Sequence, residues 1–275
     1  MFKCLVPGCL GINLPWEEWP ALAASAGFEA VDVHPLDPAK GANYYRDALA
    51  KHSIRAGGAP LPVEFRKDEA AFEASLASLD VKAALAAEIG CTAFYTWIMP
   101  ASDELPFAEN YALHEERLGE AASILSAHGC RLGLEFVGPK TSRIGKNYVF
   151  LHTMDGMIGL CEDVGPNAGL LLDSWHWYVS GATVKDILAL SAKDVVYVHV
   201  NDAPAGIARD EQMDLVRRLS GDTGVIDIAG FMGALRKIGY DGPVTPEPFV
   251  KELATLAPDK AASLAARAME TIWNG

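Results

Sequence analysis

The stretch that says most about the fold reads His128-Gly129-Cys130-Arg131-Leu132-Gly133-Leu134-Glu135-Phe136-Val137. It joins the end of an alanine-rich amphipathic segment to a short apolar run, with a glycine between them. Glycine can adopt the left-handed conformation that ends a helix, and the apolar run is typical of a buried strand. The same helix–glycine–strand junction recurs at residues 26–28, 89–91 and 238–240. This repetition predicts parallel strands that are joined by helices.

Working outward from this junction, short apolar runs alternate with longer helical patterns along the whole chain. The expected strands are Phe2–Gly8, Ala30–His34, Ser53–Gly57, Ala93–Ile98, Arg131–Val137, Gly169–Asp173, Val195–Val200 and Pro243–Pro248. The expected helices are Trp16–Ala26, Asn43–Lys51, Glu69–Ile89, Leu113–His128, Thr153–Val164, Thr183–Ser191, Ile228–Ile238 and Leu256–Trp273. Eight strands, each followed by a helix, predict an α/β fold with a single (β/α)8 TIM barrel domain over residues 1–275.

The alternative α/β architecture is an open, doubly wound sheet. Such a sheet usually has fewer strands and carries a phosphate-binding glycine loop after the first one. Here the first strand runs into Pro7-Gly8-Cys9-Leu10-Gly11, which lacks that glycine spacing. No internal linker rich in Ser, Pro or Gly marks a second domain. The pattern therefore favours the barrel.

Composition narrows the functional classes. The formal net charge of −13 at pH 7 opposes contact with a phosphate backbone, so nucleic acid is not an expected partner. No apolar stretch has the length of a signal peptide or a membrane span, so we expect no membrane partner. The five cysteines are odd in number and form no CxxC pair, which argues against disulfides and a thiolate metal site. A cytoplasmic location is the expectation.

Ionisable side chains stand near the ends of the last four expected strands, where barrels of this kind place their active sites. They are Glu135, Asp173, His199 and Glu247. Three carboxylates at one rim would repel one another unless a cation neutralises them, so this pattern predicts one bound divalent metal ion. Carboxylate oxygens with a single imidazole suit Mn²⁺, which we expect as the cofactor; Mg²⁺, Co²⁺ or Zn²⁺ could replace it.

The same residues and their neighbours resemble a known family. Over nearly its whole length the chain is similar to the xylose isomerase-like superfamily of sugar isomerases and epimerases, which includes ketose 3-epimerases, hydroxypyruvate isomerase, inosose dehydratase and dehydroshikimate dehydratase. The resemblance rests on Glu135, Asp173-Ser174-Trp175-His176, His199-Val200-Asn201-Asp202 and Glu247-Pro248-Phe249. It implies that Glu135 and Glu247 ligate the metal and also act as the acid/base pair, and that His176 lies beside the substrate.

Further candidate substrate contacts come from four positions. Trp97 and Phe249 could form an apolar wall against a sugar, although core packing explains Trp97 equally well. Arg218 opens a segment, residues 218–227, that resembles the basic, glycine-rich segment of the family; an ordinary turn capped by Asp227 explains the same residues. Lys140 lies in the loop 138–143, which departs from the family pattern. With Arg143, it suits a carboxylate or extended substrate as readily as a plain ketose.

The leading hypothesis is a metal-dependent isomerase or epimerase of a small sugar or polyhydroxylated keto compound. The metal would hold a carbonyl and an adjacent hydroxyl, one glutamate would remove the intervening proton, and the cation would stabilise the bound enediolate. The alternative is a lyase or dehydratase of the inosose or dehydroshikimate type, in which His176 or Lys140 protonates a departing hydroxyl.

Two other classes are less favoured. A repair nuclease of this barrel type needs extra ligands, and the third and fourth strands end in Gly57-Gly58 and Ile98-Met99, which supply none. A binding protein without catalytic activity would not need the intact set of four ligands. Apolar helical stretches such as Ala83–Ile89 could pack in the barrel shell or across an interface, and a homodimer is the expectation.

Overall fold

The structure of the protein is a computed structural model that describes residues 1–273. One parallel sheet is built from β1 (Phe2–Leu5), β2 (Ala30–Val31), β3 (Arg55–Ala56), β4 (Gly58–Pro60), β5 (Ala93–Ile98), β7 (Arg131–Phe136), β9 (Ala168–Asp173), β10 (Val195–Val200) and β11 (Pro243–Pro246). These strands follow the order β3-β2-β1-β11-β10-β9-β7-β5-β4. The first and last members of this order, β3 and β4, are separated in sequence by Gly57 alone.

The sheet therefore closes on itself at Gly57, and its nine segments correspond to the eight expected strands. A side chain at Gly57 would clash with Cys4 Sγ, and its Cβ would lie 2.7 Å from Asp32 Oδ1. Glycine is required here because a Cβ atom would enter the packed interior of the barrel, where no room is left for it. The predicted (β/α)8 TIM barrel is confirmed.

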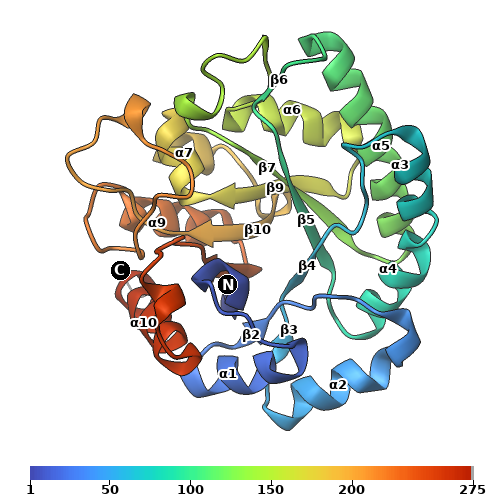
Figure 1. Cartoon of the computed structure of the whole chain (residues 1–275), viewed down its shortest axis with the longest axis vertical. Helices are drawn as coiled ribbons and strands as arrows, with labels where there is room; N and C mark the ends of the chain where they lie inside the picture. The colour runs from blue at the N-terminus through green and yellow to red at the C-terminus, as the bar shows by residue number, and fades with distance from the viewer. Residues whose placement is uncertain (274–275) are drawn as a thin grey trace.

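Helices form the outer ring around the strands, as Figure 1 shows. They are α1 (Trp19–Ala26), α2 (Gly41–Lys51), α3 (Glu69–Leu76), α4 (Leu79–Glu88), α5 (Phe107–Ala127), α6 (Met154–Val164), α7 (Ser174–Ser180), α8 (Val184–Leu188), α9 (Ile228–Ile238) and α10 (Pro258–Trp273). In the part of the chain that the structure describes, no helix is both long and apolar enough to cross a bilayer. All five cysteines are free.

Three local differences separate the structure from the sequence-based expectation. The helix expected over Glu69–Ile89 is broken into α3 and α4, and the Ser78 hydroxyl donates to the Ser75 carbonyl at the break. Such a side-chain bond to a nearby carbonyl competes with the helical pattern. The short helix α7 was not expected. A small antiparallel pair, β6 (Ala101–Ser102) with β8 (Tyr148–Val149), also lay outside the prediction.

The barrel interior below the carboxyl-terminal rim contains a buried carboxylate, that of Asp32. Its Oδ1 accepts hydrogen bonds from the Gly58 N–H and the Tyr197 hydroxyl, both at 2.8 Å, and from Cys4 Sγ at 3.3 Å. Its Oδ2 accepts from the Tyr95 hydroxyl at 2.6 Å. This network ties β1, β4, β5 and β10 to the end of β2. It satisfies a charge that would otherwise be costly to bury.

We expect Asp32→Ala to lower the free energy of unfolding by about 3 kcal/mol or more, because it leaves the Tyr95 and Tyr197 hydroxyls and the Gly58 N–H without their acceptor. The change in melting temperature measures the effect. Asp47→Ala, at an exposed position on α2, is the control and should change stability by less than about 0.5 kcal/mol. Equal melting temperatures for the two variants would contradict this role of the network.

Candidate metal centre

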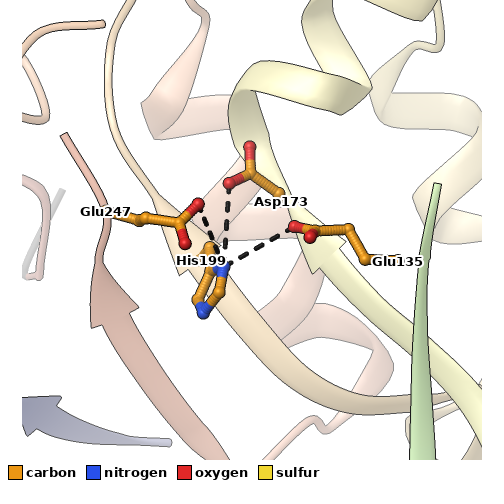
Figure 2. A group of neighbouring side chains, drawn as sticks. All are labelled: Glu135, Asp173, His199 and Glu247. Carbon is orange, nitrogen blue, oxygen red and sulfur yellow. Dashed lines mark ion pairs between the residues drawn. The ribbon is translucent and has the colours of Figure 1, made fainter. Parts of the chain in front are cut away.

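Four ionisable side chains meet at the carboxyl-terminal end of the barrel. Glu135 lies on β7, Asp173 ends β9, His199 lies on β10, and Glu247 directly follows β11. These strands are neighbours in the sheet, and His199 is paired in register with Asp173. One ligand atom from each side chain lies within 4.8 Å of those of the other three. Figure 2 shows the three carboxylates arranged around the imidazole of His199.

Several atoms in this cluster lack partners. The His199 Nδ1 atom lies 3.6 Å from Glu135 Oε1, 3.9 Å from Asp173 Oδ2 and 3.3 Å from Glu247 Oε2. Both imidazole nitrogens and Glu135 Oε1 are buried without a hydrogen-bond partner. Buried polar atoms are normally satisfied, so orphaned donors and acceptors around one point favour an additional bound group. Three carboxylates with one imidazole are a donor set that fits a divalent cation.

The two carboxylate oxygens of Asp173 have different roles, one in capping a helix and one in the cluster. Oδ1 accepts the backbone N–H groups of Trp175 at 2.6 Å and His176 at 3.0 Å, which caps the amino terminus of α7. Oδ2 points into the cluster and accepts from Arg217 Nη1 at 2.8 Å. The cap explains both why a helix begins immediately after the strand and why His176 lies next to the cluster.

Arg217 is a site residue that the sequence analysis missed. Its side chain is 2 % exposed, and Nη1 also donates to Glu247 Oε2 at 2.7 Å. Its Nη2 donates to Asp214 Oδ1 at 2.9 Å. The guanidinium lies 4.9 Å from the Trp175 ring centroid and 4.8 Å from that of Phe249. Carboxylate oxygens have more than one lone pair, so these contacts leave acceptor capacity for a cation.

The neighbouring Arg218, which the sequence analysis proposed, is turned away from the cluster. Its side chain is exposed and donates to the Arg217 carbonyl, while its backbone pairs with Asp202 in an antiparallel bridge. Successive residues of an extended segment point to opposite sides, so only one of the two arginines can face inward. In the sequence, the excess of carboxylates at the rim indicated a nearby positive charge. It did not show whether Arg217 or Arg218 supplies that charge.

His176 lies next to the cluster and is buried, with 2 % of the residue exposed. Its Nδ1 accepts the Gly138 N–H at 3.2 Å, and its Nε2 lies 3.1 Å from Arg217 Nη2. Burial and the charge of Arg217 lower the pKa of His176 to about 4, so its imidazole is neutral near pH 7. A Cβ at Gly138 would lie 2.6 Å from the His176 carbonyl oxygen, which explains the glycine at this close approach.

The remaining candidates lie at different depths. Trp97 stands at the rim and is 46 % exposed. Phe249 is half-buried and packs on Arg217. Lys140 is exposed and pairs with Asp210 at 2.8 Å. The structure thus brings Glu135, Asp173, His199, Glu247 and His176 into one group and leaves Lys140 and Arg218 at the surface.

The cluster strongly perturbs its own ionisation. Burial, reinforced by the charge of Glu247, raises the pKa of Glu135 well above its usual range. Burial also disfavours the charged forms of Glu247 and His199. For Glu247, however, the positive charges of His199 and Arg217 outweigh burial and lower its pKa. For His199, the carboxylates of Glu247 and Glu135 outweigh burial and raise its pKa.

These pKa shifts predict that cation binding depends on pH. Glu135 and His199 hold protons near neutral pH, and both must be unprotonated to coordinate a cation, so binding should release at least one proton. We expect the affinity for Mn²⁺ to rise between about pH 6 and about pH 8, by about tenfold per pH unit for each proton released. Calorimetric titration in buffers of different ionisation enthalpy measures both quantities. Glu120→Gln, at an exposed position on α5, should behave as wild type, and binding without proton release would contradict the assignment.

Comparison with known proteins places this geometry in a family. Residues 20–272 match the family model described as xylose isomerase-like TIM barrel. The ketose 3-epimerase of Arthrobacter globiformis is 27% identical over 243 residues, which cover 85% of this chain and 77% of that protein. The inosose isomerase of Bacillus licheniformis is 27% identical over 148 residues, which cover 53% of this chain and only 49% of that protein. The chain thus matches about half the length of that inosose isomerase.

Solved structures agree with this result. A xylose isomerase domain protein from Alicyclobacillus acidocaldarius superposes with a TM-score of 0.89 at 28% identity, covering 99% of this chain and 98% of that one. The IOLI protein, whose structure was determined with a zinc atom, superposes with a TM-score of 0.82 at 19% identity, covering 99% and 98% of the two chains, and supports the fold. This chain belongs to the xylose isomerase-like TIM barrel family.

Proposed function

We propose that this protein is a divalent-metal-dependent isomerase or epimerase that moves a proton on a small sugar or sugar-like polyol ketone. The observation that carries the proposal is the cluster of Glu135, Asp173, His199 and Glu247 in a barrel of this family. Within it, Glu135 Oε1 and both ring nitrogens of His199 are buried without a hydrogen-bond partner. Relatives of the chain include ketose 3-epimerases and inosose isomerases, which supports an enzyme of this kind. We propose Mn²⁺ as the metal, because oxygen ligands with one imidazole suit it.

The four cluster residues would hold the ion, and the ion would act as a Lewis acid on a substrate carbonyl and the adjacent hydroxyl. Glu135 and Glu247 lie on opposite sides of His199 (Figure 2). A carbon held between them would be accessible to one carboxylate on each face. Removal of a proton by one glutamate and return of a proton by the other would invert that centre. Return to the neighbouring carbon would exchange an aldose and a ketose.

His176 would position an oxygen of the substrate. Because His176 Nδ1 accepts the Gly138 N–H, the proton of the neutral ring is on Nε2. Arg217 Nη2 lies 3.1 Å from this Nε2 and also donates to Asp214 Oδ1, so the Nε2–H itself faces another donor and lacks an acceptor. A substrate oxygen that accepts from the His176 Nε2–H would satisfy it, and it would lie next to the cluster.

The other contacts complete the proposed pocket. Trp97 and Phe249 would offer apolar surface to the C–H groups of the substrate. Lys140 and Arg218 are exposed, so in this proposal they contact only a substrate that extends beyond the rim. The alternative reaction, that of a lyase or dehydratase, requires a substrate with a hydroxyl β to the carbonyl. On such a compound the same proton removal would lead to elimination rather than isomerisation.

The test of the proposal is the pair Glu135→Gln and Glu247→Gln. Each should lower turnover by at least about a thousandfold, because each loses an acid/base group and a charged ligand together. Turnover is measured on the compound selected by a screen of ketoses, inososes and keto acids, with metal content determined for each variant. Glu120→Gln is the control and should keep full activity. A dehydrated product, detected by its lower mass, would show that the reaction is that of a lyase instead.

Solvent deuterium adds resolution to this test. A variant that retains metal should still exchange the substrate proton from the face served by the surviving glutamate, while inversion stops. If both variants keep metal and near-normal turnover, Glu135 and Glu247 are not the proton-transfer pair. His176 and Lys140 would then be the next candidates.

A further inference from the structure

Arg66 is a cation without an acidic partner in a strongly acidic protein. It lies in the loop between β4 and α3, and its Nη2 donates to Thr96 Oγ1 at 3.3 Å. Within residues 1–273, no carboxylate lies close enough to form an ion pair with it. The nearby Glu64 instead pairs with Lys67, at 3.3 Å. Arg55 also lacks an ion pair within the described residues, so the two rings around Arg66 are what set it apart.

Two aromatic rings hold the guanidinium of Arg66. Its Cζ lies 4.2 Å from the ring centroid of Phe65 and 4.1 Å from that of Trp97. Stacking on the rings fixes the plane of the guanidinium and leaves its edge free to donate hydrogen bonds. Loss of solvent around the group lowers the pKa of Arg66 to about 10, so it stays charged at neutral pH. The residue as a whole remains exposed, so an anion can reach the edge of the guanidinium from solvent.

The register of the sheet shows which way this group faces. Trp97 on β5 is paired with Glu135 on β7, so the two side chains leave the sheet on the same face. Tyr95, two residues earlier, points into the barrel, where its ring centroid lies 4.6 Å from that of Tyr197 and 6.0 Å from that of His199. Trp97 is therefore on the inner face, one step nearer the rim. Arg66 stacks on Trp97, on the same face of the sheet as Glu135.

We infer that Arg66, held by Phe65 and Trp97, binds an anionic group, a carboxylate or a phosphate, at the end of the substrate remote from the metal centre. The planar fork of a guanidinium matches two oxygens of either group. The inference rests on the proposed function, because it assumes that the substrate occupies this barrel mouth. It narrows the substrate class to acidic or phosphorylated keto sugars, in which one end meets the metal centre and the other meets Arg66.

Three unreactive polyols test the inference without turnover. D-sorbitol, L-gulonate and D-sorbitol 6-phosphate share one six-carbon chain and differ only at C6 of D-sorbitol, which is neutral, a carboxylate or a phosphate. Binding to the Mn²⁺-loaded protein is measured by calorimetry. We expect at least one anionic probe to bind about tenfold or more tightly than D-sorbitol. The probe that shows the larger preference identifies the group as carboxylate or phosphate.

Variants assign that preference to Arg66. Arg66→Gln should weaken binding of the preferred anion by about 10- to 100-fold and leave D-sorbitol binding unchanged. Arg66→Lys should lose less, because it keeps the charge but not the fork. The matched control is Arg55→Gln: Arg55 also stacks on a ring, at 4.1 Å from the Phe2 centroid, but begins β3 at the opposite end of the barrel. It should bind every probe as wild type does.

Two results would overturn the inference. One is equal affinity of the wild-type protein for all three probes. The other is an anion preference that survives Arg66→Gln at unchanged metal content, which would move the anion to another cation such as Arg143 or Arg217. These probes have no ketone or aldehyde group and are not turned over. Their affinities are therefore independent of the turnover measured for Glu135→Gln and Glu247→Gln. The anion site can thus stand if the proton-transfer proposal fails, and it can fail while that proposal stands.

Discussion

The buried carboxylate of Asp173 connects the barrel, the helix that follows it and the candidate metal centre. One oxygen is held by two backbone N–H groups of α7, which restricts the side chain and directs the other oxygen toward His199 and Arg217. Asn201 Nδ2 donates to both oxygens, at 3.3 and 3.1 Å. A carboxylate with no solvent exposure is tolerated because these bonds replace water. The same bonds give the site a fixed ligand that does not have to be ordered when a cation binds.

The charges around Asp173 explain why a further cation is expected. Arg217 is the buried cation paired with Asp173, and it also pairs with Glu247 and Asp214. The charge of Glu135 acts on it as well. One arginine leaves an excess of negative charge, and the raised pKa values of Glu135 and His199 favour their protonated forms. A divalent ion would replace those protons. In this account Arg217 and the ion share the neutralisation.

Much of this arrangement could be predicted from the amino-acid sequence, and the remainder depends on contacts that are distant in the chain. The strands Ala93–Ile98 and Val195–Val200 agree with β5 and β10 to the residue, because continuous apolar runs between glycines and polar turns define buried strands. The cluster could be predicted from the expected ends of the last four strands, because the carboxyl ends of parallel strands meet at one rim. Arg217 lies in an irregular segment without periodicity, and Arg66 becomes notable only through the rings that fold against it. Neither position has a local signal.

The central claim is that Glu135, Asp173, His199 and Glu247 coordinate one divalent ion. Anomalous X-ray scattering from crystals grown with Mn²⁺ tests this claim most directly, because it locates the ion independently of activity or substrate. The account predicts a single strong anomalous peak between the three carboxylates and Nδ1 of His199, with Arg217 adjacent. A peak elsewhere, or an ion at the rim with His199 outside its coordination sphere, would contradict the account.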